Sequence, residues 1–259
     1  MKAGMQLLLA ENLKTLRLSA IAKHLEEQLR QAREKRCDFD EFLLGLTEME
    51  LQVRGESRLK RRLREANFPL IKTLESFDFA AAAGLDGRLI AELSGGEYIR
   101  QKRNIILAGK TGTGKTHLAT GLGIEACKQG VTTCFISACS LVNKLVEART
   151  QKDLSRLMQK LARYGLLIVD ELGYVPFSKE GAELLFQTLA QRHERGSVII
   201  TTNLGFGDWT QVFADPNLTA ALLDRLTHKA QIINCTWESY RFKETMKMQN
   251  ITEKTHKKG

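Results

Sequence analysis

Eight consecutive residues, Gly109–Thr116, read Gly-Lys-Thr-Gly-Thr-Gly-Lys-Thr and complete the pattern G-x-x-x-x-G-K-[ST]. The apolar run Asn104–Ala108 precedes them, and a helical pattern follows over Lys115–Lys128. Glycines permit the tight turn that directs successive backbone N–H groups at phosphate oxygens, and the helix N-terminus adds its dipole. This strand, loop and helix constrain the chain to a phosphate-binding α/β fold and predict a nucleoside triphosphate site.

The residue types within this loop predict separate tasks. The Lys115 ammonium is expected to reach the β- and γ-phosphates, and the Thr116 hydroxyl is expected to ligate Mg²⁺. The alternative is a glycine-rich turn without a ligand, and the flanking strand and helix argue against it. The predicted nucleotide-contacting residues are Gly109, Lys110, Thr111, Gly112, Thr113, Gly114, Lys115, Thr116 and His117.

From about residue 70 onward, short apolar runs alternate with helical patterns. The runs are mostly continuous, as in strands buried on both faces, so they predict a parallel sheet flanked by helices. In such a sheet the nucleotide lies at the carboxyl ends of the strands. The predicted strands are Asn104–Ala108, Thr132–Ser137, Leu166–Val169, Ser197–Thr202 and Ala230–Cys235, and the predicted helices are Lys115–Lys128, Leu141–Ala148, Leu154–Tyr164, Lys179–Arg195 and Leu218–Leu226.

The predicted strand Leu166–Val169 is followed by two carboxylates, Asp170 and Glu171. Asp170 is suited to hold Mg²⁺ beside Thr116, and Glu171 is suited to orient or deprotonate an attacking water. Two carboxylates suit a hydrolase, because the metal needs one and the water needs another. Asn203 follows the fourth run, where it either positions the water near the γ-phosphate or simply terminates the strand.

Two arginines are candidates for contacts with transition-state charge. Arg225 lies on the predicted helix Leu218–Leu226, where it either serves the nucleotide of a neighbouring subunit or is a surface arginine beside Asp224. Arg241 is a weaker candidate for a phosphate contact within its own chain.

Residues 1–66 predict a separate all-helical domain, since apolar residues recur there at helical spacing. Pro69 then interrupts the helical pattern. The expected division is a helical N-terminal domain over 1–66, an ATPase domain over 67–245 and a basic tail over 246–259. Within 1–66 we expect one amphipathic face formed by Leu13, Leu16, Ile21, Leu25 and Leu29, a second helix from about Asp38 or Asp40, and a third from about Ser57 to Ala66.

The chain has a formal net charge of +9, which favours a polyanionic partner. Six cations lie between Arg54 and Arg64 against one acid, Glu56. On a helix, most of them share one face, which is either a phosphate-contacting stripe for duplex DNA with little sequence specificity or a solvated basic face. The candidate nucleic-acid residues are Arg54, Arg58, Lys60, Arg61, Arg62 and Arg64.

The five cysteines show no C-x-x-C spacing, and the five histidines share no metal-ligand spacing. The apolar stretch Met5–Ala10 is too short for a membrane span or for the core of a signal peptide. We therefore expect a reduced, cytoplasmic protein without a disulfide framework or a zinc site.

These residues resemble the IstB family, which comprises helper ATPases of bacterial insertion-sequence transposition and is related to the DnaC helicase loader within the AAA+ ATPases. The resemblance covers nearly the whole chain. It rests on Gly109–His117, Leu166–Glu171, Val198–Asn203 and Leu222–Leu226, together with Arg64–Pro69 and Lys72–Phe79 upstream.

The resemblance implies an AAA+ core with strand order 5-1-4-3-2, and ATP with Mg²⁺ bound at the subunit interfaces of a homo-oligomer. It implies Asn203 as the sensor residue, Arg225 as a finger acting on the neighbouring subunit, and Phe77 and Phe79 near the adenine. The implied role is ATP-dependent multimerisation on duplex DNA that prepares the target and stimulates a cognate transposase in the bacterial cytoplasm. The stretch after the fifth strand is too short for a full helical lid, which leaves a second sensor role for Arg241 open.

Three other functions share parts of this pattern. A replicative helicase loader has the same core, but the resemblance in residues 1–80 favours transposition. A small-molecule phosphotransferase needs an arginine-rich lid, for which the sequence offers no convincing candidate. A nucleotide-gated binding module has little need for Lys115, Asp170 and Glu171 together.

Overall fold

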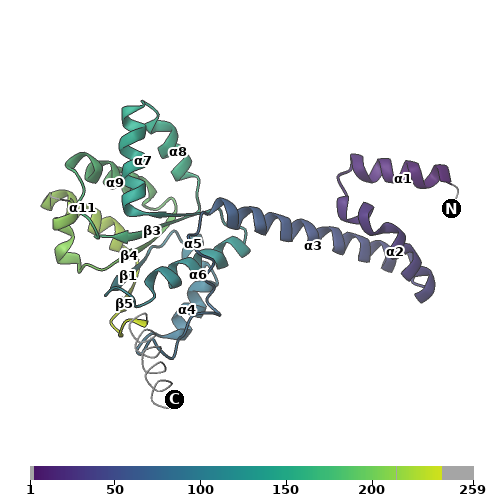
Figure 1. The fold of residues 1–259 in the computed structure, drawn as a ribbon, viewed down its shortest axis with the longest axis horizontal. Coiled ribbons are helices and arrows are strands. Elements are labelled where there is room, and N and C mark those ends of the chain that lie inside the picture. Colours follow the sequence, from purple (N-terminus) through teal and green to yellow (C-terminus); the bar gives the residue numbers. More distant parts are fainter. Residues whose placement is uncertain (1–2, 214, 241–259) are drawn as a thin grey trace, which may run out of the picture. The chain divides into compact units, whose positions relative to one another are not determined.

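The computed structural model describes residues 3–213 and 215–240 (Figure 1). The chain packs as two compact units, Met1–Arg61 and Arg62–Gly259, and the division falls within one long helix, α3. The sequence-based boundary after residue 66 follows the end of α3 at Glu65 and stays a prediction. The predicted tail over 246–259 lies outside the described residues.

The N-terminal unit is helical, and its core is small. Leu13, Ile21 and Leu46 are buried together, with partly buried apolar side chains packed around them. The expected single amphipathic face is wrong, because the chain turns between two helices at Arg17, which has a φ of 57°, and Leu16 is exposed. The expected break before Ser57 is also wrong, because Gly55 weakens a helix by only about 1 kcal/mol and does not end it. The helices are α1 (Ala3–Thr15), α2 (Ser19–Lys35) and α3 (Phe39–Glu65).

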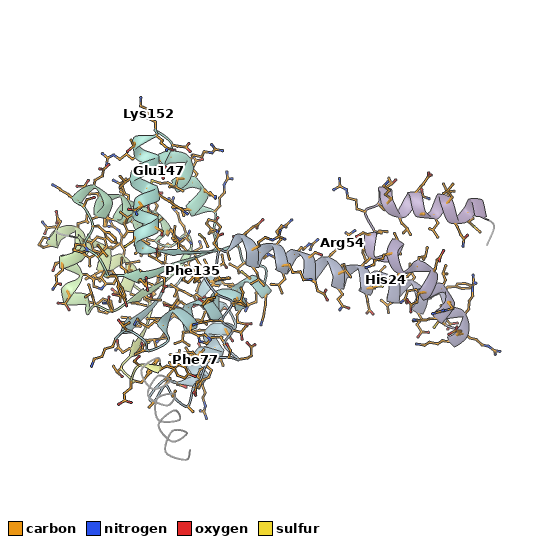
Figure 2. All side chains as sticks on the ribbon, in the orientation of Figure 1. His24, Arg54, Phe77, Phe135, Glu147 and Lys152 are labelled. Atoms are coloured by element: carbon orange, nitrogen blue, oxygen red, sulfur yellow. The ribbon has the colours of Figure 1, made fainter. Side chains whose placement is uncertain are left out.

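A buried carboxylate joins α2 to α3. Glu50 Oε2 accepts hydrogen bonds from the backbone N–H groups of Ala20 (2.8 Å) and Ile21 (3.1 Å), two donors in the first turn of α2. Glu50 Oε1 accepts from Arg54 Nε at 2.8 Å, and Arg54 Nη2 donates to the Arg17 carbonyl at 2.5 Å. Figure 2 labels Arg54 on the N-terminal unit. Burial acts to raise the pKa of Glu50, but these hydrogen bonds outweigh it, so the pKa lies below the ordinary value.

The second unit contains a parallel five-stranded sheet in the order β2-β3-β4-β1-β5. This is the expected order 5-1-4-3-2 read from the other edge. Ile105 of β1 pairs with Ile199 of β4 on one side and with Gln231 of β5 on the other. The strands are β1 (Ile105–Gly109), β2 (Thr133–Ser137), β3 (Leu166–Leu172), β4 (Ser197–Thr202) and β5 (Gln231–Cys235).

Helices cover both faces of this sheet, because consecutive strand residues point to opposite faces and both sets are apolar (Figure 1). Ile105 and Leu107 pack on one side with α4 (Gly87–Ser94), α5 (Glu97–Arg100) and α6 (Lys115–Lys128). Ile106 packs on the other. That side carries α7 (Ala138–Thr150), α8 (Leu154–Ala162), α9 (Lys179–Arg192), the 3₁₀ helix η1 (Phe206–Trp209), α10 (Thr210–Phe213) and α11 (Pro216–Thr227).

This arrangement brings the ends of β1, β3 and β4 together, because the three strands are parallel neighbours at the centre of the sheet. The phosphate loop, the acidic pair and Asn203 each follow or end one of these strands. Within the described part of the chain, none of the helices combines the length and the apolarity that a membrane crossing requires.

Candidate nucleotide-binding site

The loop between β1 and α6 needs glycine for two separate reasons. Gly109, Gly112 and Gly114 have positive φ values of 153°, 83° and 90°, which side chains rarely adopt. In addition, a Cβ atom at Gly109 would overlap the Cys235 carbonyl, and one at Gly114 would lie 2.8 Å from the Phe77 ring. The glycines of the motif therefore fit both the curl of the loop and its close neighbours.

Lys115 begins α6, and its side chain is buried against the loop. Its Nζ donates hydrogen bonds to the carbonyl oxygens of Gly109 and Lys110, both at 2.7 Å. The ammonium is thereby fixed on the inside of the phosphate loop. This position fits the prediction that the Lys115 ammonium reaches the β- and γ-phosphates.

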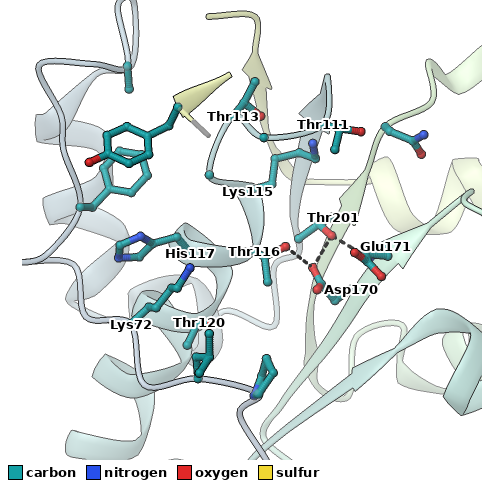
Figure 3. Close-up of a pocket in the computed structure, with 18 of the residues that line it drawn as sticks. Lys72, Thr111, Thr113, Lys115, Thr116, His117, Thr120, Asp170, Glu171 and Thr201 are labelled. Atoms are coloured by element: carbon teal, nitrogen blue, oxygen red, sulfur yellow. Dashed lines mark hydrogen bonds between the residues drawn. The ribbon is translucent and has the colours of Figure 1, made fainter. Parts of the chain in front are cut away.

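Asp170 ends the regular part of β3 and is 5% exposed. Its Oδ1 accepts hydrogen bonds from Thr116 Oγ1 at 3.1 Å and from Thr201 Oγ1 at 2.5 Å (Figure 3). Burial raises the pKa of Asp170, and these two hydrogen bonds oppose that shift without cancelling it. A carboxylate and a hydroxyl, both oxygen donors that suit Mg²⁺, therefore lie next to each other as expected.

A β-bulge directs Glu171. The pairing of β3 with β4 shifts between Val169 and Leu172, and Glu171 has a left-handed φ of 59°. Its backbone N–H donates to Thr201 Oγ1 at 2.8 Å, and the residue is exposed where it lines the cavity. Adjacent residues on β3 are therefore placed differently: Asp170 is buried beside Thr116, and Glu171 faces solvent.

A cavity of about 760 Å³ lies over the phosphate loop and the ends of β3 and β4. This volume falls in the range of small-molecule sites. Asn203, directly after β4, lines the same cavity as Asp170 and Glu171, and its expected place beside the γ-phosphate stays a prediction. Other lining residues include Thr111, Thr113, Lys115, Thr116, His117, Phe77, Asp170 and Glu171.

The two phenylalanines expected near the adenine differ in position. Phe77 lines the cavity, and its ring meets the His117 ring edge-on at 5.2 Å between centres. His117 Nε2 also lies 2.8 Å from the Thr73 carbonyl oxygen, and this contact joins α6 to the segment that contains Thr73 and Phe77. Phe79 packs edge-on against Phe77 at 5.0 Å and is not among the lining residues.

Several lining residues were missed in the sequence analysis. Trp237 Nε1 donates to the Thr113 carbonyl at 2.8 Å, and the Tyr240 backbone N–H donates to the Gly112 carbonyl at 3.0 Å. Thr201 bridges Asp170 and Glu171. A hydroxyl inside an apolar strand is a signal that could have indicated Thr201, although Thr202 shares it, and no local pattern marks Trp237.

Arg225 does not reach the cavity of its own chain. It lies on α11 with its guanidinium carbon 5.2 Å from the centre of the Phe186 ring, and its Nη1 is buried without a hydrogen-bond partner. The phosphate contact suggested for Arg241 falls on a residue outside the described part of the chain.

The basic candidates on α3 separate into groups. Arg54, Arg58 and Arg61 line a groove of about 420 Å³ in the N-terminal unit, together with Arg17, which was not among the sequence candidates. Lys60 does not line this groove, and Arg62 and Arg64 belong to the second unit. Arg54 also holds the turn before α2, so it has a structural task in addition to any contact with DNA.

Sequence comparisons identify a family and relatives whose names indicate ATP binding, as the cavity geometry does. The family described as IstB-like ATP binding protein matches residues 11–248. The putative ATP-binding protein of insertion sequence IS21 from Pseudomonas aeruginosa is 38% identical, over 94% of this chain and 92% of its own length. The counterpart from IS232 of Bacillus thuringiensis subsp. berliner is 35% identical, over 93% of this chain and 97% of its own length.

Solved structures show the same fold at low identity. The replication initiator DnaA bound to AMPPCP and single-stranded DNA is 21% identical with a TM-score of 0.54, over 71% of this chain and 57% of that one. A structure of DnaI is 18% identical with a TM-score of 0.53, over 68% of this chain and 93% of that one. Because the family match covers residues 11–248 and the relatives are similar along most of their length, the chain belongs to the IstB-like family of ATP-binding proteins.

Proposed function

We propose that this protein hydrolyses ATP with Mg²⁺, multimerises on duplex DNA and assists the transposase of an insertion sequence. The observation that carries the hydrolytic part is the pairing of a buried Asp170, hydrogen-bonded to Thr116, with a solvent-facing Glu171 in the cavity of the phosphate loop. A protein that only binds nucleotide has no use for the second carboxylate. The insertion-sequence part is supported by the names of the relatives.

Five of the residues that line the cavity have a task in this proposal. Thr116 and Asp170 would hold Mg²⁺, which neutralises phosphate charge when it is bound. The raised pKa of Asp170 fits this, because a cation stabilises the ionised carboxylate that burial disfavours. Lys115 would bind the β- and γ-phosphates, Glu171 would orient the attacking water or accept its proton, and Asn203 would help to position that water.

Arg225 supports a site completed by a second copy of the chain. The residue lies outside the cavity of its own chain, and one of its guanidinium nitrogens lacks a hydrogen-bond partner. An arginine supplied by a neighbour is worth about 10³–10⁵ in turnover in related phosphoryl-transfer systems. Arg225→Ala should therefore lower turnover and leave nucleotide binding by the monomer intact.

Mixing two inactive variants tests this shared site. Arg225→Ala protein keeps Glu171, and Glu171→Gln protein keeps Arg225, so a mixed interface can hold both intact groups. We expect ATP hydrolysis to return when the two are mixed under subunit exchange, while each alone stays inactive. If mixing restores nothing, Arg225 is not supplied by a neighbouring subunit.

DNA binding is proposed for the groove lined by Arg17, Arg58 and Arg61. Each lost phosphate contact should reduce the slope of log affinity against log salt by about 0.9. Arg58→Ala is the variant of choice, because Arg54→Ala would also disturb the turn before α2. Arg156→Ala, an exposed arginine in the other unit, is the control and should leave the slope unchanged. An unchanged slope for Arg58→Ala would exclude this groove.

The whole proposal is tested by the ATPase rate with and without duplex DNA, alongside particle size. Faster turnover together with larger particles supports it, whereas DNA-independent turnover by a monomer favours a small-molecule phosphotransferase. The alternative of a helicase loader has the same fold, so it differs only in its partner. A pull-down against the transposase of the same insertion sequence and against a replicative helicase distinguishes the two.

A further inference from the structure

Away from the nucleotide cavity, two helix ends bring three metal-ligating side chains together. His193 follows α9, Glu194 is its neighbour, and His228 follows α11. One ligand atom of each side chain lies within 4.8 Å of those of the other two, and the two imidazole rings are 5.7 Å apart between centres. Among the residues that the structure describes, no other group of three or more has this spacing.

The position of the two histidines favours a cation. Each is the C-terminal cap of its helix, and helix C-termini carry partial negative charge. The helices α9 and α11 pack against each other in the same apolar core. The cluster therefore receives the negative ends of two helix dipoles as well as the carboxylate of Glu194.

A hydrogen bond orients the His193 ring in the way that metal-binding histidines are commonly oriented. Its Nδ1 lies 3.1 Å from the backbone carbonyl oxygen of Arg225. An imidazole that donates Nδ1–H to this carbonyl keeps its lone pair on Nε2, and metal-binding histidines are commonly oriented by such a bond to a backbone carbonyl. The hydrogen bond spans two helices, so it fixes the ring relative to α11.

The donor set selects the kind of metal. Two imidazoles and one carboxylate suit Zn²⁺ and its neighbours Co²⁺ and Ni²⁺, whereas Mg²⁺ and Ca²⁺ require mostly oxygen donors. Basic neighbours also disfavour weakly bound ions, since Arg195 and Lys229 lie next to two of the ligands in sequence. Arg192 is directed away from the cluster, donating to the carbonyls of Leu161, Tyr164 and Ser197.

We propose that His193, Glu194 and His228 bind a divalent transition-metal ion of the Zn²⁺ class that joins the C-terminal ends of α9 and α11. Three protein ligands leave the fourth tetrahedral position to water. The ion fixes the end of the helix that carries Arg225, the residue whose carbonyl orients His193. Binding at this cluster does not require nucleotide or hydrolysis, so it stands apart from the proposed ATPase activity.

Titration of the full-length, nucleotide-free protein with Co²⁺ tests the site, because tetrahedral Co²⁺ absorbs visible light. We expect one equivalent to bind and Zn²⁺ to displace it. Glu194→Gln and His228→Ala remove exposed ligands and should weaken binding at least tenfold, the lower end of what loss of an outer-sphere partner costs. His24→Ala, in the N-terminal unit, is the control and should bind as the parent does.

Two further measurements keep the test independent of folding. His193→Asn keeps an amide that can donate to the Arg225 carbonyl but loses the ring nitrogen, so it should fold normally and bind metal weakly. Zn²⁺ should raise the thermal midpoint of the parent and not that of His228→Ala. The proposal is overturned if the parent binds no stoichiometric metal, if His228→Ala binds equally well, or if thiolate-to-Co²⁺ charge-transfer bands show that cysteines hold the ion.

Discussion

Each of the two compact units buries one carboxylate, and the surrounding chain treats the two differently. Glu50 in the N-terminal unit receives two backbone N–H groups and Arg54, and its pKa lies below the ordinary value. Asp170 in the second unit accepts hydrogen bonds from the hydroxyl groups of Thr116 and Thr201, yet burial outweighs the favourable contacts and raises its pKa. Among the described residues these are the two buried acids. The first charge is satisfied by the protein itself, and the second is suited to a cation that binds later.

The two units also differ in how completely they bury their apolar side chains, and here the second unit buries them better. The second unit buries apolar residues on both faces of its sheet. The N-terminal unit buries Leu13, Ile21 and Leu46 and leaves large side chains in solvent, such as Phe39, which is 92% exposed, and Leu51, which is 69% exposed. The N-terminal unit therefore hydrogen-bonds its buried carboxylate fully but leaves large apolar side chains exposed to solvent. Burial alone does not distinguish a structural carboxylate such as Glu50 from a functional candidate such as Asp170; the hydrogen-bond partners of each carboxylate do.

Among the variants that test this comparison of the two units, Glu171→Gln should have the largest effect on turnover, because it removes the proposed base and leaves Asp170 in place. We expect turnover to fall by about 10²–10⁴, with nucleotide binding retained. Phosphate release measured beside the binding of a fluorescent ATP analogue checks both. Normal turnover would mean that the solvent-facing carboxylate has no chemical role and that Asp170 alone defines the site.

Thr201→Val tests the bridge between the two carboxylates. The change leaves the Glu171 N–H without its acceptor and takes one hydroxyl donor from Asp170. A loss of about 1–3 kcal/mol lowers turnover by a factor of roughly 5–150. Thr201→Ser keeps the hydroxyl and should retain activity. Equal activity of the two variants would show that the bridge does not position Glu171.

Glu50→Ala tests whether the charge in the N-terminal unit is structural. Two N–H groups of α2 lose their acceptor, so we expect about 1–3 kcal/mol of destabilisation. Hydrogen exchange should rise in α1 and α2 while nucleotide binding is unchanged. Glu48→Ala, on the exposed side of the same helix, is the control. Lost nucleotide binding would contradict the separation of the two roles.

The same residue predicts a pH dependence of the N-terminal unit. Because the pKa of Glu50 is lowered by folding, its contribution to stability is present above the ordinary pKa of 4.5. That contribution is lost as the pH falls through the lower pKa of the folded state. Faster exchange in α2 on acidification, absent in Glu50→Ala, is the expected observation.

Asp170→Asn should have the smallest effect. It should raise the free energy of unfolding, whereas Glu50→Ala lowers it. The pKa of Asp170 is raised, so the ionised form is disfavoured in the folded state and lowers stability once the pH rises through that pKa. Without nucleotide, the variant should be more stable than the parent at neutral pH, and the difference should vanish as the pH falls below the ordinary value of 3.8. Denaturant unfolding at both pH values checks this, with the exposed Asp153→Asn as control. A less stable variant at neutral pH would mean that the charge is already compensated.

The sequence by itself determined the phosphate loop, the sheet and the acidic pair. Gly109–Thr116 was recognisable because the chemistry of phosphate binding fixes residue types at adjacent positions. The five predicted strands agree with the structure to within a few residues, and the largest difference is the continuation of β3 to Leu172. Continuous apolar runs identify strands buried on both faces without knowledge of their neighbours.

Only the tertiary structure decided which residues complete these sites. Thr201 touches Asp170 and Glu171, and Trp237 touches Thr113, across separations in sequence that no local pattern records. The five histidines share no metal-ligand spacing in the sequence, yet His193 and His228 meet because α9 and α11 pack side by side. Periodicity reports which face of an element is apolar, whereas the meeting of distant side chains depends on how whole elements pack.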